Sequence, residues 1–219
     1  MSDHIDPVKL DRLAEVAVRT GVNLQPGQDL VITAPMAALD LVRRITVHAY
    51  KAGAGIVTPF FSDDAITLAR YNHAPDESFD RAPNWFFDGM AAAFKGGAAR
   101  MAITGDDPML LAEQDPTKVA RLSKATAIAA KPAMGPIVGF EVNWNIVAYP
   151  GAAWAAQVYP DIPVDEAQGK LMDAIYAASR LEGDDPVANW AEHTATCLLY
   201  TSPSPRDEQF HLVCRLLLE

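Results

Sequence analysis

The sequence predicts an α/β fold with a mostly parallel sheet and helices on both faces of the sheet. Short, β-branched apolar runs alternate with longer segments in which apolar residues recur every three or four positions. Strands separated by helical crossovers build parallel sheets that helices cover. Half of the 219 residues are hydrophobic and 21% are charged, a globular composition whose length allows one domain or one and a half.

The first predicted elements are a helix and a buried strand. Asp6 followed by Pro7 is typical of a helix N-cap with a first-turn proline, and predicts a helix over 6–20 that Gly21 closes. The run LVITAP at 30–35 predicts a strand that is buried on both faces.

A second helix and a second strand follow. Apolar residues at helical spacing predict an amphipathic helix that ends at Gly53, namely Ala38, Leu41, Val42, Ile45 and Ala49. The run GIVTPFF at 55–61 predicts the next strand. Its Pro59 has no N–H for a ladder, so we expect that residue at the strand's end. Two helical segments, 65–71 and 83–94, come after it.

The next stretch predicts two more strands around a helix. A strand is predicted at 100–104, after Gly96 and Gly97. Asp115-Pro116 is a second capping signal, and it predicts a helix over 116–130 that stops before Pro132. An extended run at 141–148 predicts the fourth strand, with short helical material around Trp154 after it.

The last predicted elements are two helices. The apolar stripe at 164–178 predicts a helix that Gly183 closes, and Asp185-Pro186 starts another. From Thr196 the sequence shows neither helical nor strand periodicity, so we predict that the last helix stops there.

This change of pattern divides the chain into an α/β domain, 1–195, and a non-native or disordered tail, 196–219. The tail string CLLYTSPSPRD resembles translated adapter DNA. A loop that feeds a short terminal strand is the alternative.

Charge and hydropathy exclude several classes of partner. Eighteen basic against 28 acidic residues give a net charge of −10, which repels nucleic acid and anionic lipid. No run reaches the roughly 18 to 20 apolar residues of a membrane helix, and the first residues lack the pattern of a secretion signal. We therefore predict a soluble, cytoplasmic protein that binds neither nucleic acid nor membranes.

Standard metal and nucleotide motifs are missing. Both cysteines, Cys197 and Cys214, lie in the last 23 residues, which excludes a disulfide framework or a thiolate metal site in the body of the chain. No H-E-x-x-H, G-x-S-x-G or P-loop pattern occurs. The glycines at 53–55 and 96–97 precede predicted strands rather than helices, which disfavours a dinucleotide site.

Three acidic doublets are candidate metal or acid–base residues: Asp63-Asp64, Asp106-Asp107 and Asp184-Asp185. The first two follow predicted strands, where α/β proteins bind ligands. The competing interpretation is helix capping, because Asp107 and Asp185 each precede a proline and carboxylates are favoured at helix N-termini. Capping is the interpretation that we prefer.

The histidines are too dispersed to form a ligand set. His48 borders the apolar stripe of its helix and is expected to be a hydrogen-bonded residue at the margin of the core. His73 is expected in a solvated turn and His193 on the last helix, while His4 and His211 are near the chain ends.

Four aromatic residues at five-residue intervals, Trp144, Tyr149, Trp154 and Tyr159, predict ordinary core packing. The alternative is that they line a substrate cleft or a subunit interface.

Several long segments, in the same order, resemble the two-metal aminopeptidases of the thermophilic aminopeptidase T, AmpS and PepS type. The resemblance covers about residues 8–195 and rests on LAEVAVRTGVNLQPGQDLVITAP, LVRRITVHAYKAGAGIVTPFFSDD, ITGDDPMLLAEQDPTKVAR, VNWNIVAYPGAAWAAQVYPD and KLMDAIYAASRLEGDDPVANWAEH. It implies a cytoplasmic, homodimeric exopeptidase that removes N-terminal residues from peptides with two divalent metal ions of Zn, Co or Mg type.

The same resemblance places the family's metal ligands in a second half that this chain lacks, since family members are roughly twice as long. It therefore assigns no catalytic residue and no metal ligand here, and it leaves substrate-binding residues unknown. We expect this N-terminal domain to bind no metal and to be inactive alone. A face meant for the catalytic half is expected to leave an apolar patch exposed.

Two alternatives use the residues differently. The chain is then either a stand-alone α/β module that binds a small ligand, or a magnesium-dependent phosphoryl-transfer enzyme that uses Asp63, Asp64, Asp106 and Asp107.

Overall fold

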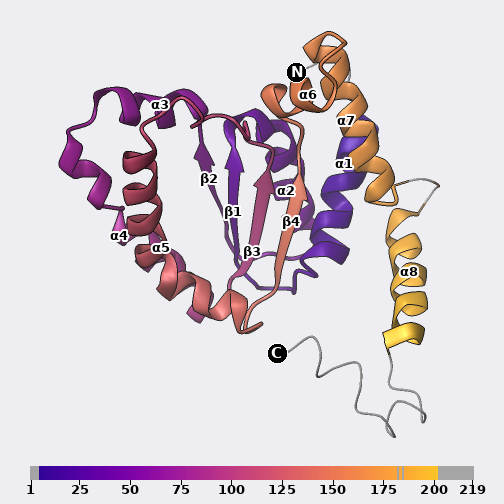
Figure 1. The fold of residues 1–219 in the computed structure, drawn as a ribbon. Helices are drawn as coiled ribbons and strands as arrows, with labels where there is room; N and C mark the ends of the chain where they lie inside the picture. The colour runs from indigo at the N-terminus through magenta and orange to yellow at the C-terminus, as the bar shows by residue number, and fades with distance from the viewer. Residues whose placement is uncertain (1–4, 182, 184, 202–219) are drawn as a thin grey trace, which may run out of the picture.

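A four-stranded parallel sheet organises the structure, a computed structural model that describes residues 5–181, 183 and 185–201. The strand order is β2-β1-β3-β4, and all three strand pairs are parallel. The strands are β1 (Leu30–Pro35), β2 (Val57–Ser62), β3 (Ala99–Thr104) and β4 (Trp144–Ala148). Figure 1 shows them side by side, with their carboxyl ends at the top.

The described residues form eight α-helices, of which α1 precedes the first strand and the others connect or follow the strands. Their bounds are α1 Pro7–Val16, α2 Leu39–Lys51, α3 Asp64–His73, α4 Asn84–Lys95, α5 Pro116–Val138, α6 Ala152–Val158, α7 Val164–Ala178 and α8 Pro186–Thr201. A π-helical turn, η1 (Ala17–Gly21), extends α1, and two 3-10 helices, η2 (Met36–Ala38) and η3 (Asp76–Asp80), lie in connections. The chain from α1 through η1 thus confirms the helix predicted over 6–20.

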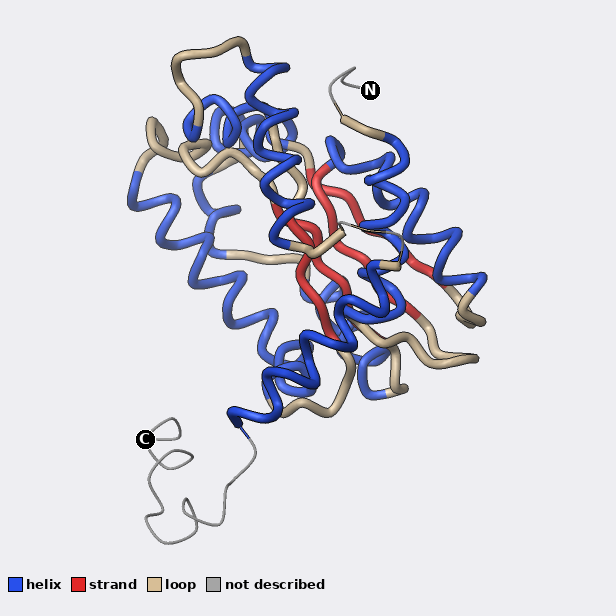
Figure 2. Tube along the Cα trace, turned by 90° about the vertical axis from the view of Figure 1, so that its right-hand side faces the viewer, coloured by secondary structure: helices blue, strands red, loops and turns tan. Residues whose placement is uncertain are grey.

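Helices cover both faces of the sheet, as predicted (Figure 2). On one face, α1, α2 and α7 pack on alternate residues of the strands, such as Leu30, Ile32 and Met101, which are 0% exposed. On the other face, the smaller core of α4 and α5 packs on Val31. The central strand β1 is therefore buried on both sides, which its continuous apolar run predicted.

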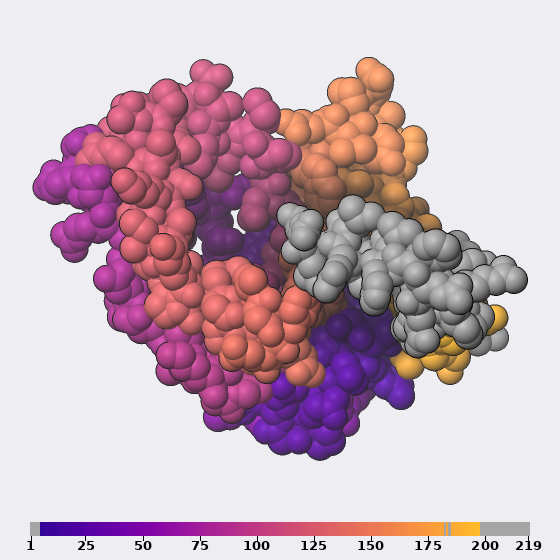
Figure 3. Space-filling model, turned by 60° about the horizontal axis from the view of Figure 1, so that its bottom comes forward, coloured from indigo at the N-terminus to yellow at the C-terminus, as the bar shows by residue number. Residues whose placement is uncertain are grey.

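The layer on the second face is incomplete. Along its 23 residues α5 buries only Ala133, Pro136 and Ile137, all near its carboxyl end. Seen from the amino ends of the strands, the surface is hollowed beside α5, and residues from the first half of the chain are visible inside the hollow (Figure 3). Part of the second face of the sheet is consequently not covered by its own helices.

Two proline predictions were wrong. Pro59 lies inside β2, opposite Ile32, and not at the strand's end. The strand tolerates it because β2 is at the edge of the sheet. Pro132 lies inside α5, which continues to Val138. Pro132 is exposed and Ile128, whose carbonyl loses its donor, is 56% exposed, so the missing hydrogen bond lies on the solvent-facing side of α5.

The prediction that the last helix stops at Thr196 was also wrong. Helix α8 runs to Thr201, and the Thr196 hydroxyl donates to the Glu192 carbonyl at 3.0 Å. No glycine or proline interrupts the chain between Pro186 and Pro203, so periodicity alone ended the predicted helix too early. The fourth strand is also shorter than predicted and begins at Trp144.

The cap of α1 provides a test of the fold. The Asp6 carboxylate accepts hydrogen bonds from the Val8 N–H at 2.8 Å and from the Lys9 N–H at 3.3 Å. We predict that Asp6→Ala lowers the free energy of unfolding by about 1 kcal/mol, because two amides lose their acceptor. Chemical denaturation measures the loss. Asp161→Ala, at an exposed position between α6 and α7, is the control, and an equal loss there would contradict the capping role.

Candidate functional site

A pocket of about 260 Å³ lies at the carboxyl edge of the sheet, where loops after all four strands meet. Met36 follows β1, Asp63 and Asp64 follow β2, Asp106 and Asp107 follow β3, and Ala152 follows β4. The chain runs from β1 outward to β2 and then back to β3 on the other side of β1. Parallel α/β sheets bind ligands at this reversal of strand order.

Two of the residues that line this pocket, Gly105 and Gly151, lie main chain against main chain. A Cβ on Gly105 would overlap the Tyr149 carbonyl, and one on Gly151 would overlap the Gly105 carbonyl. The loops after β3 and β4 therefore touch backbone to backbone, which only glycine permits. Sequence analysis did not single out these two glycines, because each is isolated and no motif marks them.

The structure brings the first two acidic doublets together at the pocket, as their positions after strands predicted. Asp63 caps α3 by accepting from the Ile66 N–H at 3.0 Å, and Asp107 accepts from the Met109 N–H at 2.8 Å in the turn that follows it. Asp185 accepts from the Ala188 N–H at 3.0 Å at the start of α8. Helix capping is confirmed for Asp63 and Asp185, whereas no helix follows Asp107, whose bond belongs to a turn. Asp184 lies outside the described residues.

Asp64 has a perturbed acidity. Burial raises the pKa of its carboxyl above the ordinary value, and the neighbouring charges of Asp106, Asp107 and Asp63 raise it further. Crowded carboxylates of this kind repel one another unless a cation lies between them. Within the described part of the chain, however, no three acidic, histidine or cysteine side chains are placed to share a metal ion.

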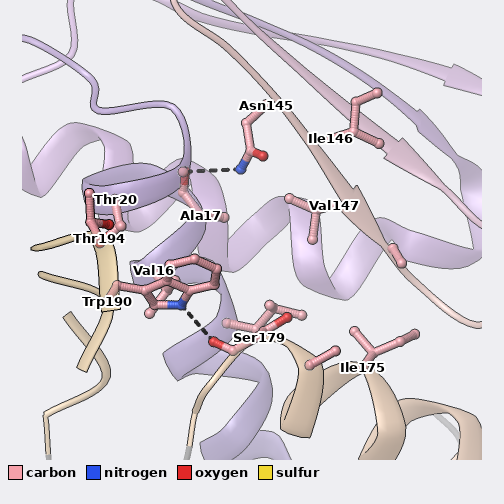
Figure 4. Close-up of a pocket in the computed structure, with 14 residues that line it drawn as sticks. Val16, Ala17, Thr20, Asn145, Ile146, Val147, Ile175, Ser179, Trp190 and Thr194 are labelled. Carbon is pink, nitrogen blue, oxygen red and sulfur yellow. Dashed lines mark hydrogen bonds between the residues drawn. The ribbon is translucent and has the colours of Figure 1, made fainter. Parts of the chain in front are cut away.

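A larger groove, of about 560 Å³, runs along β4 and is mainly apolar. Residues Asn145–Ala148 of β4 form one wall, and α1, η1, α7 and α8 form the others. Figure 4 shows Asn145 and Val147 on the side of Trp190 and Ser179, whereas the Ile146 side chain points away from them. The Trp190 Nε1 donates to the Ser179 carbonyl at 2.7 Å, which fixes α8 against α7. No local sequence pattern predicts this groove, because its walls come from segments far apart in the chain.

The histidines remain apart, as predicted. His48 on α2 has an 11% exposed side chain, and its Nε2 lies 3.2 Å from the Asp11 Oδ2, which confirms its place at the margin of the core. The predicted hydrogen bond is not formed, because this buried nitrogen has no hydrogen-bond partner among the described residues. His73 is exposed at the end of α3. His193 on α8 packs edge-on against Trp190, with ring centroids 5.6 Å apart. His4 and His211 lie outside the described residues.

Cys197 is exposed on α8, with its Sγ 3.5 Å from the His193 Nε2. Cys214 lies outside the described residues.

Three of the four aromatic residues pack in or against the main core, as predicted: Tyr149, Trp154 and Tyr159. Burial raises the pKa of the Tyr149 hydroxyl, and the nearby Asp40 raises it further. Trp144 differs, because it lies on the opposite face of the sheet and is 38% exposed. It belongs to the part of the sheet that the chain's own helices leave open.

Known proteins resemble this chain over most of its length. The family model described as thermophilic metalloprotease (M29) matches residues 7–200. Aminopeptidase T from Thermus thermophilus is 44% identical over 184 residues, and aminopeptidase AmpS from Bacillus subtilis is 36% identical over 185. Each match covers 84% of this chain but 45% of the relative. The chain thus spans about half the length of these relatives.

A solved structure shares the fold. Wild-type AmpT from Thermus thermophilus superposes with a TM-score of 0.81 at 41% identity, over 86% of this chain and 46% of that one. Sequence, family model and fold agree with the resemblance that the ordered segments indicated. The chain therefore belongs to the thermophilic metalloprotease family M29.

Proposed function

We propose that this chain is the N-terminal α/β domain of a metal-dependent aminopeptidase that releases N-terminal residues from peptides. One observation carries the proposal: a match at 44% identity spans 84% of this chain but only 45% of aminopeptidase T. In this proposal the α/β layer and its carboxyl-edge pocket belong to the parent enzyme, and more than half of the relative has no counterpart in the match.

The donors present here do not fit a two-metal centre. Asp63 and Asp107 already bind main-chain amides, and no three donor side chains converge in the part of the chain that the structure describes. We therefore derive no catalytic step from these residues. The proposed role of this domain is to shape the parent enzyme, whose two divalent ions would polarise the scissile carbonyl and activate water.

The proposal also covers the C-terminal tail and the compartment and oligomeric state of the parent enzyme. The tail, predicted to comprise residues 196–219, is proposed to be translated adapter sequence. The predicted boundary lies at 195, while α8 reaches Thr201 and the family match reaches residue 200. The parent enzyme is proposed to be a cytoplasmic homodimer. No helix in the described ranges is long and apolar enough to cross a membrane.

Activity measurements test the proposal directly. We predict that the purified 219-residue chain hydrolyses no aminoacyl reporter, with or without added Zn²⁺, Co²⁺ or Mg²⁺, because the donor set is incomplete. Purification from a host that carries the empty vector controls for contaminating peptidase. Metal-dependent hydrolysis above that background would contradict the proposal.

The source DNA provides an independent test. We predict that the reading frame, sequenced through codon 196 and beyond in intact genomic DNA, continues for about the same length again and encodes Glu, His and Asp ligands. A stop codon near residue 219 would instead favour the stand-alone binding module.

The acidic pocket gives a pH-dependent prediction. The pKa of Asp64 is raised in the folded state, so its ionisation opposes folding once the pH rises above the ordinary aspartate value. Asp64→Asn should therefore raise the melting temperature at pH 7, and the gain should vanish near pH 3, where both forms are neutral. Thermal unfolding at both pH values measures this, with the exposed Asp88→Asn as control.

The same variant tests the magnesium alternative. A magnesium site at this pocket requires saturable Mg²⁺ binding by the wild-type chain in calorimetry, and its loss in Asp64→Asn. Such a result would replace the capping interpretation.

A further inference from the structure

We propose that the parent protein adds a fifth parallel strand at the free edge of β4, formed by the segment that follows α8. The inference rests on the proposed function only in requiring that the parent chain continues beyond this one. It concerns the assembly of the sheet and not the chemistry of the enzyme, so the two can fail separately.

The main-chain groups at this edge have no partner. The Arg100 N–H donates to the Asn143 carbonyl at 2.9 Å, and the Tyr149 N–H donates to the Thr104 carbonyl at 2.8 Å. In a parallel ladder, alternate residues face one neighbour, so the odd-numbered residues of β4 face β3. The N–H and C=O groups of Trp144, Ile146 and Ala148 therefore point away from the sheet, and no described residue bonds to them.

The side chains beside this edge are apolar and exposed. Ile146 is 52% exposed and Trp144 is 38% exposed, although both lie in a strand. The groove of about 560 Å³ runs along the same strand, between β4 and the helices α1, α7 and α8. Parallel strands are normally covered on both sides, so an open edge with exposed Ile and Trp is typical of a sheet that lacks its outermost strand.

The direction of α8 indicates which segment pairs with the free edge of β4. In Figure 1 the strands point upward, while α8 runs downward on the β4 side and ends on the side where the strands begin. A chain that continues from there is placed to ascend beside β4, which makes α8 the crossover helix of a β-α-β unit. The sheet already grows outward from β1 to β3 to β4, so a fifth strand completes the common order 2-1-3-4-5.

The charge of Arg100 sets a second requirement on the segment that covers this edge. Arg100 stands opposite Trp144 on the open face, and its side chain has no ion-pair or hydrogen-bond partner among the described residues. Burial lowers the pKa of its guanidinium, because water around the charge is partly removed. An incoming segment that covers this face is expected to bring a carboxylate to Arg100.

The relative has enough additional residues to form this segment. The solved AmpT chain is covered over only 46% of its length, so more than half of it has no counterpart here. A second copy of this chain fits the groove less well, because Trp190 and Thr194 of this chain's own α8 already line it.

Amide hydrogen exchange tests the proposal. The 219-residue chain is compared with a hybrid in which residues 1–200 are followed by the part of Thermus thermophilus aminopeptidase T that lies beyond the matched segment. In the short chain, we expect the amides of Trp144, Ile146 and Ala148 to exchange much faster than those of Asn145 and Val147. In the hybrid, we expect them to be protected by about 100-fold or more, because they gain carbonyl acceptors.

A pair of substitutions adds a matched control. Ile146→Lys should leave the melting temperature of the 219-residue chain nearly unchanged but lower that of the hybrid, where a charge would be buried. Ile128→Lys on α5, at a side chain that is 56% exposed against 52% for Ile146, should change neither protein. Equal effects of Ile146→Lys in both proteins would overturn the proposal.

Two further outcomes would also overturn it. The first is a folded hybrid, active on an aminoacyl reporter, whose edge amides stay unprotected; this result would leave the proposed function standing. The second is edge protection in the 219-residue chain that depends on concentration and accompanies dimerisation, since a second copy would then occupy the edge. If the hybrid does not fold, co-expression of the two parts as separate chains permits the same exchange measurement on the purified complex.

Discussion

The hydrogen-bonded position of β1 between β2 and β3 is the constraint on which the rest of the structure depends. A strand that is paired on both edges and buried on both faces must be apolar along its whole length, and its neighbours must be reached by crossovers. Those crossovers distribute the helices over the two faces. The reversal of strand order at β1 then places the acidic loops after β2 and β3 at one pocket.

Local signals predicted most of the fold, and they failed where tertiary context outweighed them. Two helix caps, at Asp6 and Asp115, were enough to predict where their helices begin, because each cap bonds to amides close in the chain. The apolar run of β1 was enough to predict a buried strand, because it requires burial alone. Pro59 and Pro132 were misjudged because a proline's cost depends on whether its missing N–H was needed. An edge strand and the solvent-facing side of a helix do not need that N–H. Local sequence does not show whether a strand lies at the edge of a sheet or which side of a helix faces solvent.

The site was predictable only in part, for a similar reason. The doublets at 63–64 and 106–107 follow strands, so their convergence at the carboxyl edge followed from topology. The groove along β4 was not predictable, since α1, α7 and α8 build it from segments more than 100 residues apart in places. On the open second face, the apolar side chains of Trp144 and Ile146 are partly exposed.

The glycine contact beneath the acidic pocket limits how this pocket can vary among related proteins. Because Gly105 and Gly151 press main chain against main chain, no side chain can be introduced there to make the pocket shallower or to change its polarity. This backbone contact is thus a fixed part of the lining, whereas side chains that also line the pocket can vary, among them Met36, Ala37, Ala152 and Ala153. Divergence in what the pocket accepts should accumulate at such positions, and directed evolution of the parent enzyme would best begin with them.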